Sequence, residues 1–176
     1  MYLISVYFDS ATEKTLQRYI ERIARMSGNN FMIEHQIRPH MTISAIESRS
    51  IEAIRPSFEA LQDTLKWGTI QIVCLGQLLP YVFYAAPVLN EYLMDLSNRV
   101  YDAVKEMEDI KVSRYYQPYS WMPHITLAKK LDTVQMLKAF EAMQNYFAPM
   151  EGCITQIGLS RVRPYEDIVR FDLERE

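Results

Sequence analysis

The stretch Pro39-His40-Met41-Thr42-Ile43 organises the whole sequence, because its pattern occurs twice. It returns 84 positions later as Pro123-His124-Ile125-Thr126-Leu127, so that position 40 corresponds to position 124. Each copy reads proline, histidine, apolar residue, threonine, apolar residue. Successive side chains of a β-strand point to opposite faces, so the histidine and the threonine of each copy share one face. The pattern therefore predicts two short strands that each present an imidazole and a hydroxyl together.

Further matches at a similar spacing indicate an internal duplication. Phe58-Glu59-Ala60 matches Phe140-Glu141-Ala142, and Pro80-Tyr81 matches Pro164-Tyr165. This period is much longer than that of stacked repeat proteins, which favours two related halves over a repeat array. We expect the halves to cover roughly residues 1–83 and 84–176, and to form a single domain because no low-complexity linker separates them.

Hydrophobic periodicity predicts alternating strands and helices in both halves. The expected strands are residues 2–8, 41–46, 69–75, 81–86, 125–128, 153–159 and 168–173. The expected helices are residues 10–26 and 50–65, one that opens at Pro87, and one capped by Asp132 or Thr133. Together these elements predict an α+β fold of two lobes, with two antiparallel sheets and outer helices around a central cleft.

Composition limits the class of protein. The hydrophobic fraction of 49% and the charged fraction of 23% are those of an ordinary globular chain. A net charge of −3 argues against a protein that coats nucleic acid, so we expect any nucleic-acid contact in a local pocket. Cys74 and Cys153 lie in apolar runs and are expected to be buried thiols. No signal-peptide pattern or membrane-length apolar run is present, so we expect a cytoplasmic protein without a membrane partner.

Two histidines and two threonines on converging strands suit phosphodiester chemistry. Cleavage needs a base for the attacking oxygen and an acid for the leaving oxygen, and a histidine serves either role near neutral pH. Threonine hydroxyls can donate hydrogen bonds to the non-bridging phosphate oxygens. We therefore expect four catalytic residues and no metal or other cofactor. These residues are His40, Thr42, His124 and Thr126.

The paired His-x-Thr motifs resemble those of the two-histidine (2H) phosphoesterase superfamily. This superfamily includes the 2′-5′ RNA ligase-like (LigT-like) proteins and the cyclic phosphodiesterases. The resemblance extends over nearly the whole chain. It implies a bilobal fold and metal-independent hydrolysis of 2′,3′-cyclic phosphates or 2′-5′ bonds in nucleotides or RNA ends. It also implies that His124 is the base and His40 the acid.

Four further residues are candidate contacts to a nucleotide or RNA-end substrate. Many relatives in the ligase-like branch carry an arginine a few residues after the second motif. Here Lys129 and Lys130 hold that place, and a lysine offers a point charge rather than a two-pronged fork. Lys129 is a candidate phosphate contact. Tyr116, Tyr119 and Trp121 precede the second motif and would either stack on a base or cover the edge of the core.

Three other interpretations remain open at this stage. The same site could join RNA ends by a 2′-5′ linkage, which is the reverse reaction. The chain could also be a nucleotide- or RNA-binding module without efficient turnover. A metal site built from His35, His40 and His124 is conceivable, although these residues lack a recognised ligand spacing.

Overall fold

Eight strands and five α-helices make up the computed structural model, which describes residues 1–107 and 109–175. The strands are β1 (Tyr2–Phe8), β2 (Met41–Glu47), β3 (Gly68–Leu78), β4 (Val82–Pro87), β5 (Lys111–Val112), β6 (Ile125–Lys129), β7 (Met150–Val162) and β8 (Tyr165–Asp172). The helices are α1 (Ser10–Ser27), α2 (Phe31–Glu34), α3 (Arg55–Glu59), α4 (Glu91–Val104) and α5 (Thr133–Gln144). Two short 3₁₀ helices are η1 (Gln62–Thr64) and η2 (Arg114–Tyr116).

The strands pair in the order β1-β2-β6-β4-β3-β7-β8, with β5 beside β2 and a further pairing between β1 and β7. All pairings between these strands are antiparallel. The predicted α+β class with antiparallel strands is confirmed. The two expected sheets are joined into one hydrogen-bonded network, because β2 contacts β6 and because β7 is long enough to pair with β3 at its start and with β1 further along.

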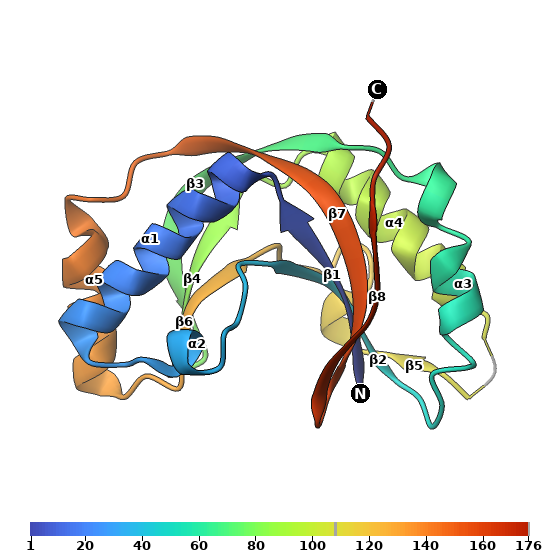
Figure 1. The fold of residues 1–176 in the computed structure, drawn as a ribbon, viewed down its shortest axis with the longest axis horizontal. Coiled ribbons are helices and arrows are strands. Elements are labelled where there is room, and N and C mark those ends of the chain that lie inside the picture. The colour runs from blue at the N-terminus through green and yellow to red at the C-terminus, as the bar shows by residue number, and fades with distance from the viewer. Residues whose placement is uncertain (108, 176) are drawn as a thin grey trace.

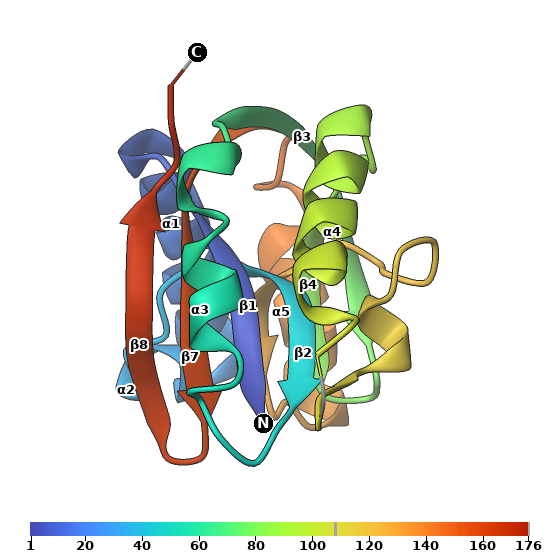
Figure 2. The same cartoon turned by 90° about the vertical axis from the view of Figure 1, so that its right-hand side faces the viewer.

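The helices lie on two sides of the molecule (Figure 1). Helices α1, α2 and α5 pack beside β6, whereas α3 and α4 pack on the side of β2. Helix α1 shows why the sequence folds this way, since Leu16, Ile20 and Ile23 fall on one helical face and are buried. The Asp9 side chain caps the start of this helix, and Gly28 ends it in a left-handed conformation with φ of 75°. Figure 2 shows β7 and β8 side by side at the edge of the sheet.

The two halves pair their strands in the same way. Strands β1 and β2 of the first half correspond to β4 and β6 of the second, and β1 pairs with β7 as β4 pairs with β3. The pairing of β1 with β2 and the pairing of β4 with β6 each contain a register shift at the equivalent place. The shift leaves Ile43 of β2 and Leu127 of β6 without a paired residue. Both skipped residues are the last residue of the repeated motif. A duplication would produce this equivalence. The duplication, with halves at roughly residues 1–83 and 84–176, stays a prediction.

Three local expectations were wrong. Pro87 ends β4 instead of opening a helix, and α4 begins after Asn90, whose side chain accepts a hydrogen bond from a backbone N–H of the first turn. The helix expected at residues 50–65 is reduced to α3 and η1. Pro56 lies in the first turn of α3, where its missing N–H is tolerated. The cysteines were expected to be buried, but Cys74 is exposed and Cys153 is partly exposed. An apolar run does not reveal which face of the sheet a strand residue occupies, so the expectation had no basis in the register.

No helix among the described residues is both long enough and apolar enough to cross a membrane.

Candidate active site

The two motif strands lie side by side and meet at one residue pair. Met41 of β2 pairs with Ile125 of β6, and both side chains are fully buried in the core. These residues occupy equivalent positions in the two motifs. Opposite residues of an antiparallel pair share a face, whereas neighbours along a strand alternate. The pairing therefore brings the motif histidines and threonines, which lie one residue to either side of Met41 and Ile125, onto the opposite face of the sheet. We call this the motif face, and its defining residues are His40, Thr42, His124 and Thr126.

Each histidine lies next to the threonine of the other motif when this register is extended by one residue. It sets His40 against Thr126 and Thr42 against His124. Directly opposite residues have Cβ atoms about 5 Å apart, and diagonal ones such as the two histidines about 7–8 Å. The structure thus brings the four predicted catalytic residues together on one face.

Both imidazoles are held in the same way, through Nδ1. The Nδ1 of His40 lies 2.8 Å from the carbonyl oxygen of Arg38, and the Nδ1 of His124 lies 2.9 Å from that of Met122. A carbonyl oxygen only accepts hydrogen bonds, so Nδ1 is the donor in both cases. The neutral tautomer therefore carries its lone pair on Nε2. Each ring is oriented by the backbone two residues earlier, and this bond leaves Nε2 free of the backbone contact.

His40 has a lowered pKa. Burial of its ring is the main cause that moves the pKa below the ordinary value of 6.5. The hydrogen bond to the Arg38 carbonyl opposes this shift, while the positive charges of His124, Lys129 and Arg170 add to it. At neutral pH His40 is consequently in the neutral form, which can accept a proton at Nε2.

Thr42 is fixed by two contacts from other parts of the chain. Its hydroxyl lies 3.3 Å from the Ser5 hydroxyl, and its backbone carbonyl accepts a 3.0 Å hydrogen bond from the Trp121 indole. When Ser5 donates to Thr42, the Thr42 proton is available for a phosphate oxygen. Thr126 is half-buried and pairs across the strands with Tyr84. Neither Ser5 nor Tyr84 was predicted as a site residue.

A tyrosine flanks each histidine. The ring centres of Tyr7 and His40 are 6.2 Å apart, and those of Tyr84 and His124 are 5.8 Å apart. The sequence motifs alone do not point to either tyrosine. Both rings lie beside a motif imidazole, so both belong to the wall of the candidate site.

Two strand glycines make room for these tyrosines. A Cβ atom on Gly76 would lie 2.4 Å from the Tyr84 hydroxyl oxygen, and one on Gly158 would lie 3.1 Å from the edge of the Tyr7 ring. Gly76 pairs with Tyr84 itself, whereas Gly158 pairs with Ser5, two residues from Tyr7. An isolated glycine in a strand often marks such a close approach, and this signal could have revealed the tyrosines in the sequence.

The remaining predicted residues differ in their surroundings. Lys129 is exposed at the end of β6, and its charge acts on His40. Trp121 is 6% exposed, so of the two roles considered for it, burial favours covering the edge of the core over stacking on a base. Tyr116 is half-buried against the core, and burial raises its pKa. Tyr119 is 88% exposed, and base stacking stays a prediction for it.

Comparison with known proteins identifies the fold. No protein-family model matches the chain, and no curated protein sequence matches it significantly. Escherichia coli LigT in complex with 3′-AMP superimposes with a TM-score of 0.63 over 98% of this chain and 97% of that chain, at 13% identity. TT0787 of Thermus thermophilus gives a TM-score of 0.65 over 99% and 98% of the two chains, at 18% identity.

The chain has the LigT-like fold. A third solved structure, described as a phosphoesterase, agrees with a TM-score of 0.57 over 98% of this chain and 97% of that chain, at 15% identity. The fold that the paired motifs implied is therefore confirmed. Within the LigT-like fold of this chain, the two motifs lie at the starts of β2 and β6, which are neighbours in the sheet and pair at Met41 and Ile125.

The third histidine lies outside this arrangement. His35 stacks on Phe31 with ring centres 4.1 Å apart and bonds through Nδ1 to the Phe31 carbonyl at 2.9 Å. Across residues 1–107 and 109–175, no three histidine, cysteine, aspartate or glutamate side chains cluster as a metal site would require. The alternative that joined His35 to the two motif histidines in a metal site therefore finds no support in the geometry.

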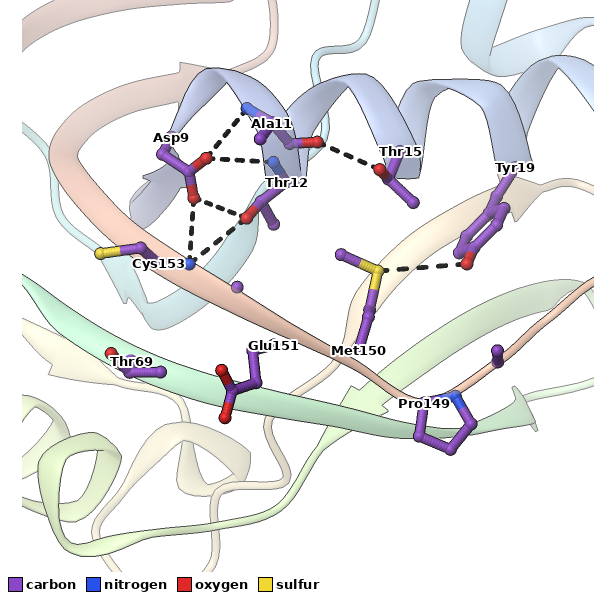
Figure 3. A pocket seen from close by; sticks show the side chains of 12 residues that line it. Asp9, Ala11, Thr12, Thr15, Tyr19, Thr69, Pro149, Met150, Glu151 and Cys153 are labelled. Atoms are coloured by element: carbon purple, nitrogen blue, oxygen red, sulfur yellow. Dashed lines mark hydrogen bonds between the residues drawn. The ribbon is translucent and has the colours of Figure 1, made fainter.

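A cavity of about 650 Å³ lies away from the motif residues, between the start of α1 and the start of β7 (Figure 3). Its central polar group, the Asp9 carboxylate, accepts hydrogen bonds from the backbone N–H groups of Ala11, Thr12 and Cys153 and from the Thr12 hydroxyl. These bonds fix the start of the helix to the strand. The Asp9 carboxylate is therefore engaged in a structural role.

Proposed function

We propose that the protein is a metal-independent phosphodiesterase that hydrolyses 2′,3′-cyclic phosphates or 2′-5′ phosphodiester bonds of nucleotides or RNA ends. The observation that carries the proposal is the antiparallel pairing of Met41 with Ile125, which gathers both histidines and both threonines on one face. Solved structures of E. coli LigT contain 3′-AMP, ATP, phosphate or NADP⁺, which is consistent with a nucleotide ligand for this fold.

In the proposed reaction a water molecule attacks the phosphorus atom of the cyclic phosphate. One imidazole takes a proton from the water at Nε2 while the other donates a proton from Nε2 to the leaving ribose oxygen. The new P–O bond forms as the bond to the ribose oxygen breaks, and the product is a phosphate monoester. The hydroxyls of Thr42 and Thr126 donate to the non-bridging oxygens, and Lys129 adds positive charge.

The electrostatics favour His40 as the base. Its lowered pKa keeps it neutral at neutral pH, so it is ready to accept the proton of the attacking water. His124 is then the acid. The resemblance implied the opposite order, and the burial of His40 is our reason for reversing it. Because the two imidazoles influence each other, the pH–rate profile reports apparent pKa values of the pair.

A substrate panel tests this function. It contains 2′,3′-cyclic nucleotides, 2′-5′-linked dinucleotides and RNAs with a cyclic phosphate end, each assayed with excess EDTA. The proposal expects cleavage of at least the cyclic nucleotides, unchanged by the chelator. Loss of activity with EDTA, restored by a divalent metal, would contradict metal-independent catalysis.

The same panel separates the two alternatives. Ligation is the reverse of 2′-5′ cleavage and would appear as joined product when RNA ends are supplied at high concentration. A binding module would bind a nucleoside 2′-phosphate or 3′-phosphate without turning over any substrate of the panel. Joined product without hydrolysis of any substrate in the panel, or binding without any turnover, would replace hydrolysis as the function.

A further inference from the structure

A continuous row of paired residues crosses four strands on the motif face. Arg170 of β8 pairs with Gly158 of β7, Gly158 pairs with Ser5 of β1, and Ser5 pairs with Thr42 of β2. Residues directly opposite one another in antiparallel strands point to the same face. Arg170 therefore shares the motif face with Thr42, three strand spacings or about 14 Å away along the backbone.

The glycine in this row lets the arginine side chain extend toward the site. A Cβ atom on Gly158 would lie 3.5 Å from Cγ of Arg170 and 3.1 Å from the ring of Tyr7, so both side chains lie over the glycine. The guanidinium carbon of Arg170 is 4.0 Å from the centre of the Tyr7 ring. Tyr7 in turn flanks His40 at 6.2 Å. The side chain of Arg170 thus extends along the motif face from β8 toward His40.

Arg170 keeps hydrogen-bond donors for a ligand. Its ion pair with Asp167 is made through one nitrogen, Nη2, at 2.8 Å, and its side chain is 26% exposed. A guanidinium has five N–H groups, so this contact leaves most of them available. Arg38 also lies over the Tyr7 ring, but it bonds to both carboxylate oxygens of Glu13, at 2.6 and 2.7 Å. Of these two arginines, Arg170 is the one suited to bind an anion.

Among the described residues, the other half of the molecule has no equivalent of this arginine in its row. There the corresponding row runs from Thr126 through Tyr84 to Gly76 and ends within β3. Strand β8 follows β7 and extends only the first row. The site is consequently asymmetric, because a positively charged side chain, Arg170, ends the row that starts at Thr42 and none among the described residues ends the row that starts at Thr126.

We propose that Arg170 binds a second phosphate of the substrate, one nucleoside away from the phosphate that reacts. A guanidinium suits this role because it can form a two-pronged contact with phosphate oxygens. The inference rests on the proposed function and narrows its substrate class. The preferred substrates are cyclic-phosphate nucleotides that also carry a 5′-phosphate, as the terminal nucleotide of an RNA chain does.

The test compares two substrates, adenosine 2′,3′-cyclic phosphate with and without a 5′-phosphate. The protein should show a kcat/KM about tenfold or more higher for the 5′-phosphorylated substrate, the size expected for one charge-assisted hydrogen bond. Arg170→Gln should bring the ratio of the two kcat/KM values close to one. The ratio is informative because any effect of Arg170 on His40 acts on both substrates alike. An unchanged ratio in Arg170→Gln, or a ratio of one in the unaltered protein, would overturn the inference.

Arg161→Gln is the matched control. Arg161 lies on the same hairpin and is ion-paired with Glu166, yet it sits an odd number of residues from Gly158 along β7 and so takes the other face. This variant should keep the substrate ratio. If Arg170→Gln fails to fold in a thermal unfolding assay, Arg170→Lys replaces it and should lower the ratio because a lysine cannot make the two-pronged contact. A ratio equal to that of the unaltered protein would then count against the inference.

Failure of the proposed function is distinguishable from failure of this inference. If the unaltered protein cleaves neither substrate, hydrolysis of 2′,3′-cyclic phosphates is wrong, and binding is measured instead by calorimetry with adenosine 3′,5′-bisphosphate and 3′-AMP. Tighter binding of the bisphosphate that is lost in Arg170→Gln would support the second phosphate site on its own. Equal binding of the two nucleotides would refute it.

Discussion

Replacing a motif histidine by asparagine removes one reactive nitrogen and preserves the local backbone contact. In both His40 and His124, Nδ1 donates to the carbonyl oxygen two residues earlier, at 2.8 and 2.9 Å. The side-chain amide of asparagine can take the place of Nδ1 and donate the same bond. No atom of asparagine reaches the position of Nε2. His40→Asn and His124→Asn therefore test proton transfer with little disturbance of the fold.

The expected loss follows from the role of Nε2. A positioned general acid or base contributes about 10²–10⁴-fold in rate, which corresponds to about 3–5 kcal/mol of transition-state stabilisation. Each variant should lower kcat/KM on a 2′,3′-cyclic nucleotide by this factor. The free energy of unfolding should change by no more than about 1 kcal/mol, because the side chains are half-buried and the backbone hydrogen bond is retained.

His35→Asn is the matched control for this experiment. His35 also donates from Nδ1 to a backbone carbonyl, at 2.9 Å, but it is exposed and lies outside the motif face. This variant should retain the activity of the unaltered protein. The assignment fails if either motif variant, shown to be folded, stays within about tenfold of the unaltered kcat/KM. It also fails if His35→Asn is equally inactive.

Three further changes have defined outcomes. Lys129→Gln should lower kcat/KM about tenfold by removing a charge near the phosphate, whereas Lys130→Gln should not; equal losses would contradict a specific role for Lys129. Trp121→Phe deprives the Thr42 carbonyl of its indole donor and should cost about 1–3 kcal/mol in urea unfolding, so unchanged stability would contradict the importance of that bond. Because the folded-state pKa of His40 lies below 6.5, the unfolded chain binds more protons, and the unfolding free energy should fall as pH drops below that value. His40→Asn should reduce this slope, and an equal slope in both proteins would refute the lowered pKa.

The shared face of each histidine-threonine pair could be predicted from the sequence because it depends on local geometry. Alternation along a strand is enough to place His40 with Thr42, and His124 with Thr126, on a common face. The recurrence of the motif led us to expect that the two copies converge. The antiparallel contact of β2 with β6 realises this convergence.

The surroundings of the pairs could not be predicted, because they depend on registers between strands far apart in the chain. Arg170 reaches the motif face only through the pairings of β8 with β7 and of β7 with β1. The bulge at Ile43 further shifts which residue of β1 meets Thr42, and so selects Ser5 as its partner. The sequence also does not reveal whether an aromatic residue near a motif is exposed or buried. Trp121 is buried, and its indole N–H donates a hydrogen bond to the Thr42 carbonyl of β2.

In the proposed reaction one phosphate contacts both motif histidines at the same time. This contact can be tested with imidazole ¹⁵N NMR spectra recorded over a pH titration, with and without 3′-AMP. The nucleotide should raise the pKa values of His40 and His124 together, because a phosphate anion favours both protonated rings, and should leave the signals of His35 unchanged. A response from only one of the two motif histidines, or from neither at saturating 3′-AMP, would contradict it.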